Sequence, residues 1–362
     1  LSRRGASVIE TAPHRSAWQN FWDRGGWWRA LLLAAVYYGL YQALSLAFLP
    51  LSARVDDPNS AAGVLVYDTL PILVGGLLLV AFIASVRWWR PVFGRQPIRG
   101  AGWMWVAVAA VLVFNILRFL TVDYSRVGLD AVATWLLAGL AIGFAEEVLT
   151  RGLVVKLMRD AGARELVVAV VSAAVFAALH AGNLLTGQDL LPTAFQLVYT
   201  FAFGICMYLA LRVTGTIIAP ILLHASTDPS IFLQTLYPAE GGLTAVAGLG
   251  NIVVIVAGLV LMIFIRGRPG ECPGEGAGQQ RAPVPSGDQY VPRLLRRAAY
   301  RARGRGRNPP RRPPPGLAGR PGTRWSHGDR AQTRLTSSLD ARHLGGQLGG
   351  RRVTHSRTLR AG

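Results

Sequence analysis

The chain has 362 residues, of which 51% are apolar and only 16% are charged. A soluble domain carries about a quarter charged residues, so this composition indicates a membrane protein. The formal net charge of +19 comes mostly from residues 266–362, which hold 21 Arg and five acids, and it therefore does not make the whole chain a nucleic-acid-binding protein.

The predicted elements begin with a polar segment, residues 1–29, which we expect to be cytoplasmic. Eight apolar runs follow, each about as long as the roughly 20 residues that a helix needs to cross a bilayer. They are residues 30–50, 64–86, 101–120, 131–157, 166–185, 193–212, 216–236 and 243–265. The sequence therefore predicts an all-α fold, a polytopic membrane bundle of about eight transmembrane helices over residues 30–265. Residues 266–362 are rich in Gly, Pro and Arg and cannot bury enough apolar surface to fold, so we predict a disordered C-terminal tail.

Basic residues mark one side of the predicted bundle. They precede the first run and follow the second, fourth, sixth and eighth, whereas the intervening loops contain mainly acids. The basic set is Arg24, Arg29, Arg87, Arg90, Arg95, Lys156, Arg159, Arg164, Arg212 and Arg266, and the acidic set is Asp56, Asp57, Asp123, Asp130, Asp189 and Glu240. Because cytoplasmic loops carry an excess of Lys and Arg, we predict that both termini are cytoplasmic in a multi-pass protein of the cell membrane.

Ionisable residues interrupt three of the predicted spans. Glu146 and Glu147 lie in the fourth span, His180 in the fifth, and His224 and Asp228 in the seventh. Each such group costs roughly 2.5–3.5 kcal/mol at bilayer depth, so these groups usually face a cavity and usually have a function. At the rise of an α-helix, their depths are compatible with one shared layer. We therefore expect them to converge on a water-accessible pocket beneath the cytoplasmic surface.

Local spacing gives these residues different roles. Glu147 and Arg151 form an i,i+4 pair in the favourable acid-first order, which we interpret mainly as a structural ion pair. Glu146 is rotated about 100° from Glu147, so it is left to act as a general base. Asp228 lies one turn beyond His224, where it is well placed to hold the imidazole ring. Either histidine taken alone fits an interhelical hydrogen-bonding residue equally well.

Four uncharged residues lie close in sequence to these ionisable groups. Gly139 and Gly143 lie one turn apart before the acid pair and allow close helix contact. Phe176 lies one turn before His180, and Asn183 lies nearly one turn after it. These positions predict that the polar groups lie at tightly packed helix crossings.

Three motifs together resemble those of the CPBP family of membrane-embedded proteases, which includes the type II CAAX prenyl endopeptidases. The family's EExxxR, FxxxH and HxxxN or HxxxD motifs correspond to EEVLTR at 146–151, FAALH at 176–180 and HASTD at 224–228. The resemblance covers about residues 131–236 of an eight-span core. It implies a catalytic set of Glu146, His180, His224 and Asp228, supported by Glu147, Arg151, Phe176 and Asn183.

The resemblance implies an intramembrane endopeptidase that hydrolyses a peptide bond near the cytoplasmic membrane face with glutamate-activated water. In this hypothesis Glu146 and His180 activate the water, and His224 stabilises the oxyanion. A zinc-dependent version would use His180, His224 and Glu146 as ligands, and because the usual HExxH helix is absent, both the zinc and the metal-free versions stay open. The expected partners are membrane lipid and a protein or peptide substrate, with no nucleic acid for the core.

Two non-enzymatic classes are the alternatives. The same buried polar cluster could serve a membrane scaffold or immunity-type protein, or a proton-coupled carrier, since buried Glu, His and Asp also form proton relays. The halves of the chain show no inverted repeat of broken helices, which weighs against a carrier. Asp68, near the outer end of the second span, fits an interfacial position as well as a place in the cluster. No residue pattern indicates whether the substrate is prenylated.

Overall fold

The computed structural model describes residues 15–98, 100–185 and 187–268. All of these residues belong to one compact unit, Leu1–Gln280. Within the described ranges the chain is helical, and its only β-type pairing is an isolated bridge between Val122 and Pro238. The predicted all-α fold is therefore confirmed. The predicted disordered tail is residues 266–362, and all of it except residues 266–268 lies outside the described residues.

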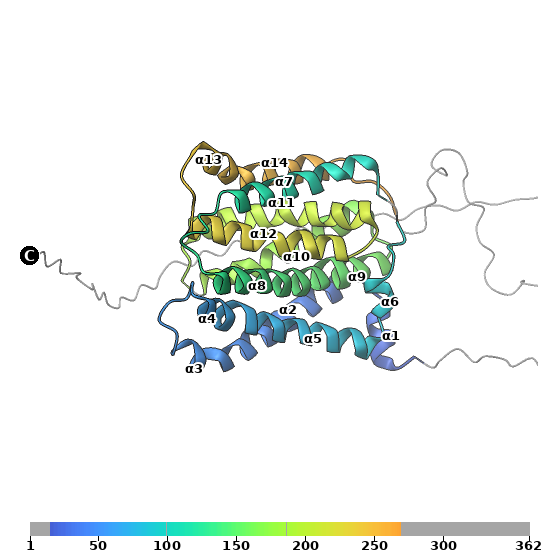
Figure 1. Cartoon of the computed structure of the whole chain (residues 1–362). Helices are drawn as coiled ribbons and strands as arrows, with labels where there is room; N and C mark the ends of the chain where they lie inside the picture. The colour runs from blue at the N-terminus through green and yellow to red at the C-terminus, as the bar shows by residue number, and fades with distance from the viewer. Residues whose placement is uncertain (1–14, 99, 186, 269–362) are drawn as a thin grey trace, which may run out of the picture. The chain divides into compact units, whose positions relative to one another are not determined.

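The helices lie side by side along a common direction (Figure 1). The α-helices are α1 (Ala17–Asp23), α2 (Trp27–Ser45), α3 (Leu49–Ser52), α4 (Ala61–Val64), α5 (Leu70–Val86), α6 (Trp89–Phe93), α7 (Trp105–Leu120), α8 (Leu129–Glu147), α9 (Val155–Asp160), α10 (Glu165–His180), α11 (Leu190–Thr214), α12 (Ile218–Leu236), α13 (Gly242–Gly248) and α14 (Gly250–Met262). Three short 3₁₀ segments are η1 (Leu46–Phe48), η3 (Gly102–Met104) and η5 (Ala181–Leu184). Two further segments, η2 (Leu65–Thr69) and η4 (Val148–Val154), are π-helical.

Seven continuous helical stretches among the described residues are long and apolar enough to cross a membrane. They are Trp27–Ser52, Ala61–Val86, Gly102–Leu120, Leu129–Asp160, Glu165–Leu184, Leu190–Thr214 and Gly242–Met262. The remaining predicted span, 216–236, is the seventh in chain order. It forms helix α12, which has 19 residues but is not among these stretches. This helix carries His224, Thr227 and Asp228 in its middle, so the span that differs from the apolar pattern is one that carries candidate site residues.

The two ends of the bundle differ in charge. One end, which we call the basic end, contains α1, α6 and α9, and the other, the acidic end, contains α3 and α13 (Figure 1). Backbone hydrogen bonds join the loops at the basic end, from Gly26 to Leu157 and from Gln96 to Gly215. The basic set of the sequence lies at this end. At the acidic end, the loop before α8 pairs with the loop after α12, where the amide of Asp123 donates to the carbonyl of Tyr237.

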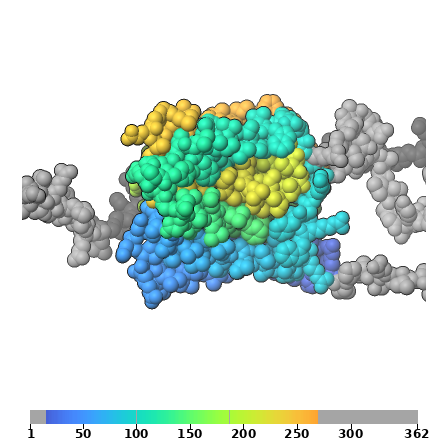
Figure 2. All heavy atoms as spheres, viewed as in Figure 1, coloured from blue at the N-terminus to red at the C-terminus, as the bar shows by residue number. Residues whose placement is uncertain are grey.

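Helix α8 is central because it packs against both α12 and α5. Figure 2 shows a strip of α12, in yellow, at the surface between α7 and α8. Large apolar side chains around the bundle remain exposed, as expected of surfaces that face lipid. The exposed tryptophans Trp18, Trp27, Trp28, Trp89 and Trp105 all lie towards the basic end. Such aromatic residues are enriched at a membrane–water interface.

Candidate active site

The two adjacent glutamates are the last residues of α8, and the π-helical turn η4 follows them directly. A π-helical turn carries i→i+5 hydrogen bonds and is frequent at functional sites. Two side chains satisfy carbonyl groups here: Thr150 Oγ1 donates to Glu146 O at 2.6 Å, and Ser172 Oγ donates to Thr150 O at 2.9 Å. The wide turn is therefore supported by a neighbouring helix as well as by its own sequence.

Glu147 is fully buried and makes two polar contacts through one oxygen. Its Oε1 lies 3.1 Å from a terminal nitrogen of Arg151 and 2.9 Å from Nδ1 of His224. The Arg151 guanidinium also lies over the ring of Phe176, 4.6 Å from the ring centroid. The predicted i,i+4 pair is thus present, and the same carboxylate reaches across to α12.

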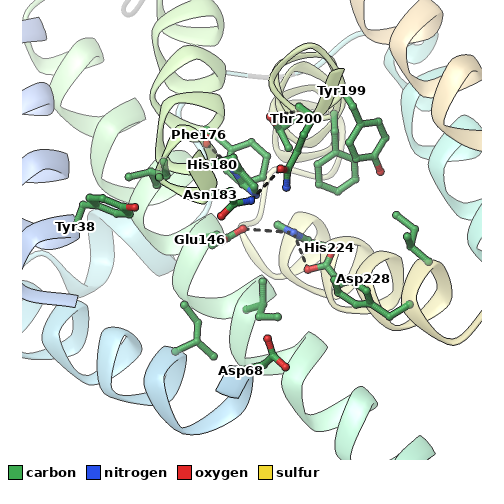
Figure 3. Close-up of a pocket in the computed structure, with 18 of the residues that line it drawn as sticks. Tyr38, Asp68, Glu146, Phe176, His180, Asn183, Tyr199, Thr200, His224 and Asp228 are labelled. Carbon is green, nitrogen blue, oxygen red and sulfur yellow. Dashed lines mark hydrogen bonds and ion pairs between the residues drawn. The ribbon is translucent and has the colours of Figure 1, made fainter. Parts of the chain in front are cut away.

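The imidazole of His224 lies between two aromatic rings and faces two further carboxylates. Its centroid is 5.7 Å from that of Phe176 and 4.9 Å from that of Phe203, both in edge-on contacts. Its Nε2 is 3.6 Å from Glu146 Oε2 and 3.5 Å from Asp228 Oδ2 (Figure 3). Asp228 therefore faces Nε2, and it is Glu147 that lies at hydrogen-bond distance from Nδ1.

Glu146 and Glu147 are adjacent in the sequence but have different surroundings. The side chain of Glu147 is 0% exposed, whereas that of Glu146 is 20% exposed and lines a pocket. The angle of about 100° between successive residues of a helix accounts for this division. One acid is a buried support, and the other is a carboxylate that solvent can reach.

His180 ends α10 and approaches the same pocket from a separate helix (Figure 3). Its Nδ1 lies 3.0 Å from the carbonyl oxygen of Phe176. A carbonyl oxygen only accepts, so Nδ1 carries the hydrogen and Nε2 of the neutral ring is left as an acceptor. Asn183, in the 3₁₀ turn after it, donates to Gln196 Oε1 at 2.9 Å, which ties this turn to α11.

The pocket has a volume of about 650 Å³, within the usual range for ligand sites. Glu146, His180, His224 and Asp228 all line it, so the structure brings the four predicted catalytic residues to one cavity from α8, α10 and α12. The supporting residues Phe176 and Asn183 also line the cavity, whereas Glu147 and Arg151 are buried behind it.

The comparisons with known proteins concern this same part of the chain. Residues 128–229 match the family model described as type II CAAX prenyl endopeptidase Rce1-like. The segment runs from the residue before α8 to Pro229 in α12 and contains all three motifs. This segment is similar to an Rce1-like domain. No curated protein matches the chain significantly.

At the level of the family, this match supports a CAAX-protease-like intramembrane protease. The match covers α8 to most of α12, while the pocket also takes residues from α2, η2 and α5 before the match and Asn251 of α14 after it. The segment that carries the family motifs is therefore completed by helices on both sides of it in the sequence.

Two residues around the site, Phe203 and Asn115, were not expected from the sequence. Phe203 of α11 packs against the ring of His224. Asp68 of η2, for which the sequence left two positions open, lines the pocket. Asn115 of α7 donates to Ser226 Oγ at 2.9 Å and to Thr227 Oγ1 at 2.8 Å, and so joins α7 to α12. A sequence signal exists for Asn115, since it is a polar residue inside an apolar run. Phe203 is one of many aromatic residues in the spans and has no such signal.

The donor groups of the Rce1-like site do not fit a zinc ion as they are arranged. In the described ranges no three His, Cys, Asp or Glu side chains are grouped so as to hold a metal. Each imidazole has a polar partner at Nδ1, the Phe176 carbonyl for His180 and the Glu147 carboxylate for His224, which leaves only Nε2 of each ring to bind a ligand. We therefore derive no catalytic step through zinc.

Proposed function

We propose that the protein is an intramembrane endopeptidase in which Glu146 activates the attacking water. The observation that carries this proposal is the contrast between the two glutamates. Glu146 is a partly exposed carboxylate 3.6 Å from Nε2 of His224, and the far side of that ring is held by the buried Glu147. A general base, a donor for the oxyanion and a group that orients the donor are thus within reach of one cavity.

The first step uses His180 and Glu146 together. The acceptor nitrogen Nε2 of His180 holds one hydrogen of the water, and Glu146 removes the other proton as the water oxygen attacks the peptide carbonyl carbon. Both groups line the pocket, so a water between them can reach a bound peptide. A positioned general base of this kind contributes about 10²–10⁴-fold to the rate.

The second step uses His224 as a donor. With Nδ1–H bound to Glu147, a ring that is also protonated at Nε2 donates to the oxyanion of the tetrahedral intermediate. Glu146 then gives its proton to the leaving amine nitrogen as the carbon–nitrogen bond breaks. Asp228, 3.5 Å from Nε2, stabilises the protonated ring. The expected partners are a peptide substrate and the surrounding lipid.

The test is peptide cleavage by the full chain reconstituted in lipid vesicles, read by mass spectrometry on a peptide panel that contains prenylated and unmodified members. We expect Glu146→Gln to abolish the products that the wild-type protein forms. Glu240→Gln, the same change at an exposed loop residue, is the matched control and should leave the products unchanged. Cleavage by Glu146→Gln at the wild-type rate would contradict the proposal.

The same assay separates the remaining alternatives. Cleavage that survives exhaustive chelation supports the metal-free version, whereas loss that is restored by added zinc supports a zinc ion that rearranges the donors. If neither wild type nor Glu146→Gln cleaves any peptide and both restore function to a deletion strain, the protein acts as a scaffold.

A further inference from the structure

The mouth of the pocket lies towards the acidic end of the bundle. Its lining includes Gln42 near the end of α2, Tyr67 in η2, Asn183 in η5, and Pro192 and Phe195 at the start of α11. Helices α2 and α10 reach the acidic end where they finish, and the second and sixth membrane-spanning stretches begin there. Tyr67 and Phe195 are 44% and 54% exposed, so this side of the pocket is open.

The opposite side of the pocket is closed by buried residues. The residues between Glu146 and the basic end include a layer of side chains that are at most 1% exposed. They are Glu147, Arg151, Leu153 and Leu157. A peptide from the basic end would have to displace this packed layer. The described part of the pocket lining includes no residue from the loops at the basic end.

A buried ion cluster lies across the basic end of the same helices. Glu165, at the start of α10, accepts two hydrogen bonds from Arg159 at 2.9 and 2.7 Å and one from Arg212 at 3.0 Å. The hydroxyl of Tyr208 donates to the same carboxylate. Separating one partner from a buried ion pair leaves an uncompensated buried charge, so this cluster opposes separation of the helices here.

The charge of the two ends decides which end faces the cytoplasm. Loops at the basic end contain the basic set, and the loops at the acidic end contain the acidic set with only Arg54 and Arg126 as basic residues. Cytoplasmic loops carry the excess of Lys and Arg, so the basic end is the cytoplasmic one. In that orientation the pocket opens away from the cytoplasm.

From these observations we infer that the pocket receives its peptide from the non-cytoplasmic side of the membrane. The substrate class is then a protein segment exposed on that side, or within that half of the bilayer, rather than the cytoplasmic end of a chain. Two expectations from the sequence, cytoplasmic termini and cleavage near the cytoplasmic face, exclude one another in this fold, and the charge pattern favours the first. The substrate part of this inference rests on the proposed function, whereas the side on which the pocket opens does not.

The test is cysteine accessibility in a Cys272→Ser background, in which Cys206 stays because it is fully buried. Single cysteines are placed at the pocket (Gln42→Cys), at the exposed acidic-end loop (Asn59→Cys) and at the exposed basic end (Ala161→Cys). The probe is a membrane-impermeant trimethylammonium methanethiosulfonate. It is applied to intact cells and to inside-out vesicles, with total labelling after denaturation as the measure of how much protein is present.

We expect Gln42→Cys and Asn59→Cys to react in intact cells and Ala161→Cys to react only in inside-out vesicles. Two outcomes overturn the inference. If Gln42→Cys and Ala161→Cys both react only in inside-out vesicles, the pocket opens at the basic end. Reversal of all three means that the basic end faces outward and the pocket faces the cytoplasm.

A second arm separates failure of this inference from failure of the proposed function. A peptide segment cleaved in vesicles is fused to a membrane anchor so that it lies on one side of the membrane or on the other, and both fusions are expressed with wild type and with Glu146→Gln. Cleavage of only the non-cytoplasmic fusion, by wild type alone, is the expected result. Cleavage of only the cytoplasmic fusion overturns the side and leaves the proposed function standing.

Discussion

Glu146 and Glu147 are adjacent, but the angle of about 100° between them on the helix gives one a supporting role and the other a chemical role. Glu147 is fully buried and uses a single oxygen to contact both Arg151 and His224, whereas Glu146 is 20% exposed in the pocket. The sequence predicts the ion pair of Glu147 with Arg151 and leaves Glu146 outside that pair, as the structure has it. It does not predict that Glu147 contacts His224, because 77 residues separate the two in the chain.

The tautomer of His180 leads to a prediction about its role. Because Nδ1 donates to the Phe176 carbonyl, Nε2 is the acceptor that we expect to orient the attacking water. His180→Gln should lower kcat by about 10²-fold while the melting temperature stays close to that of the wild type. Circular dichroism melting and the vesicle cleavage assay measure the two quantities. A loss of activity that follows a loss of folded protein would assign His180 a structural role instead.

At the scale of the elements, the crossing of α8 and α12 sets the geometry of the site. A Cβ at Gly143 would lie 2.7 Å from the carbonyl oxygen of Ile221 and 2.9 Å from the amide of Ala225, and one at Gly139 would lie 2.5 Å from the Ala225 oxygen. The two glycines therefore let the backbone of α12 approach α8 closely and bring His224 beside the glutamates. The sequence predicts this close contact from the spacing of the glycines.

Gly143→Ala tests this crossing. The added methyl group must push α12 away, and overpacking of this kind costs about 1–3 kcal/mol. We expect a lower melting temperature and a fall in kcat, because His224 moves with α12. Gly39→Ala in α2 is the matched control, since a Cβ there meets nothing within 4 Å. Equal effects of the two substitutions would show that the crossing is not tightly packed.

The π-helical turns are the elements that sequence reasoning did not find. The widened turn η4 is held in part by Ser172 of α10, whose hydroxyl reaches the carbonyl of Thr150. That contact joins residues 22 positions apart and exists only after α10 has packed. Asp68 reaches the pocket from the other π-helical turn, η2, which explains why its place in the cluster stayed open.

For the whole molecule, hydropathy predicts nearly all of the architecture. Of the eight predicted spans, seven are long apolar helices among the described residues, and the remaining one, 216–236, is helix α12. The side on which the pocket opens cannot be predicted without the structure. Glu146 lies in the middle of the continuous stretch Leu129–Asp160, and its sequence position does not point to either end of the bundle. The flanking helices α2 and α11 decide it, since their outer turns form the mouth.

The ion cluster at the basic end is expected to stabilise the whole bundle. Glu165 joins α9, α10 and α11 through Arg159, Tyr208 and Arg212. We expect Glu165→Gln to destabilise the protein by about 3–5 kcal/mol, because two buried guanidinium groups lose their charged partner. Asp160→Asn, which breaks the partly exposed pair with Lys156, should cost much less. Denaturant unfolding in detergent measures both, and equal losses would contradict a stabilising role for the cluster.

Chemical rescue is the most direct test of Glu146 as a general base in a water-accessible pocket. Glu146→Ala leaves a space in a cavity of about 650 Å³, so added formate can take the place of the missing carboxylate. The account predicts that formate restores peptide cleavage by Glu146→Ala in a concentration-dependent manner and does not restore cleavage by His224→Ala. Wild-type cleavage by Glu146→Ala without formate, or no rescue at any concentration in a protein that is folded, would contradict it.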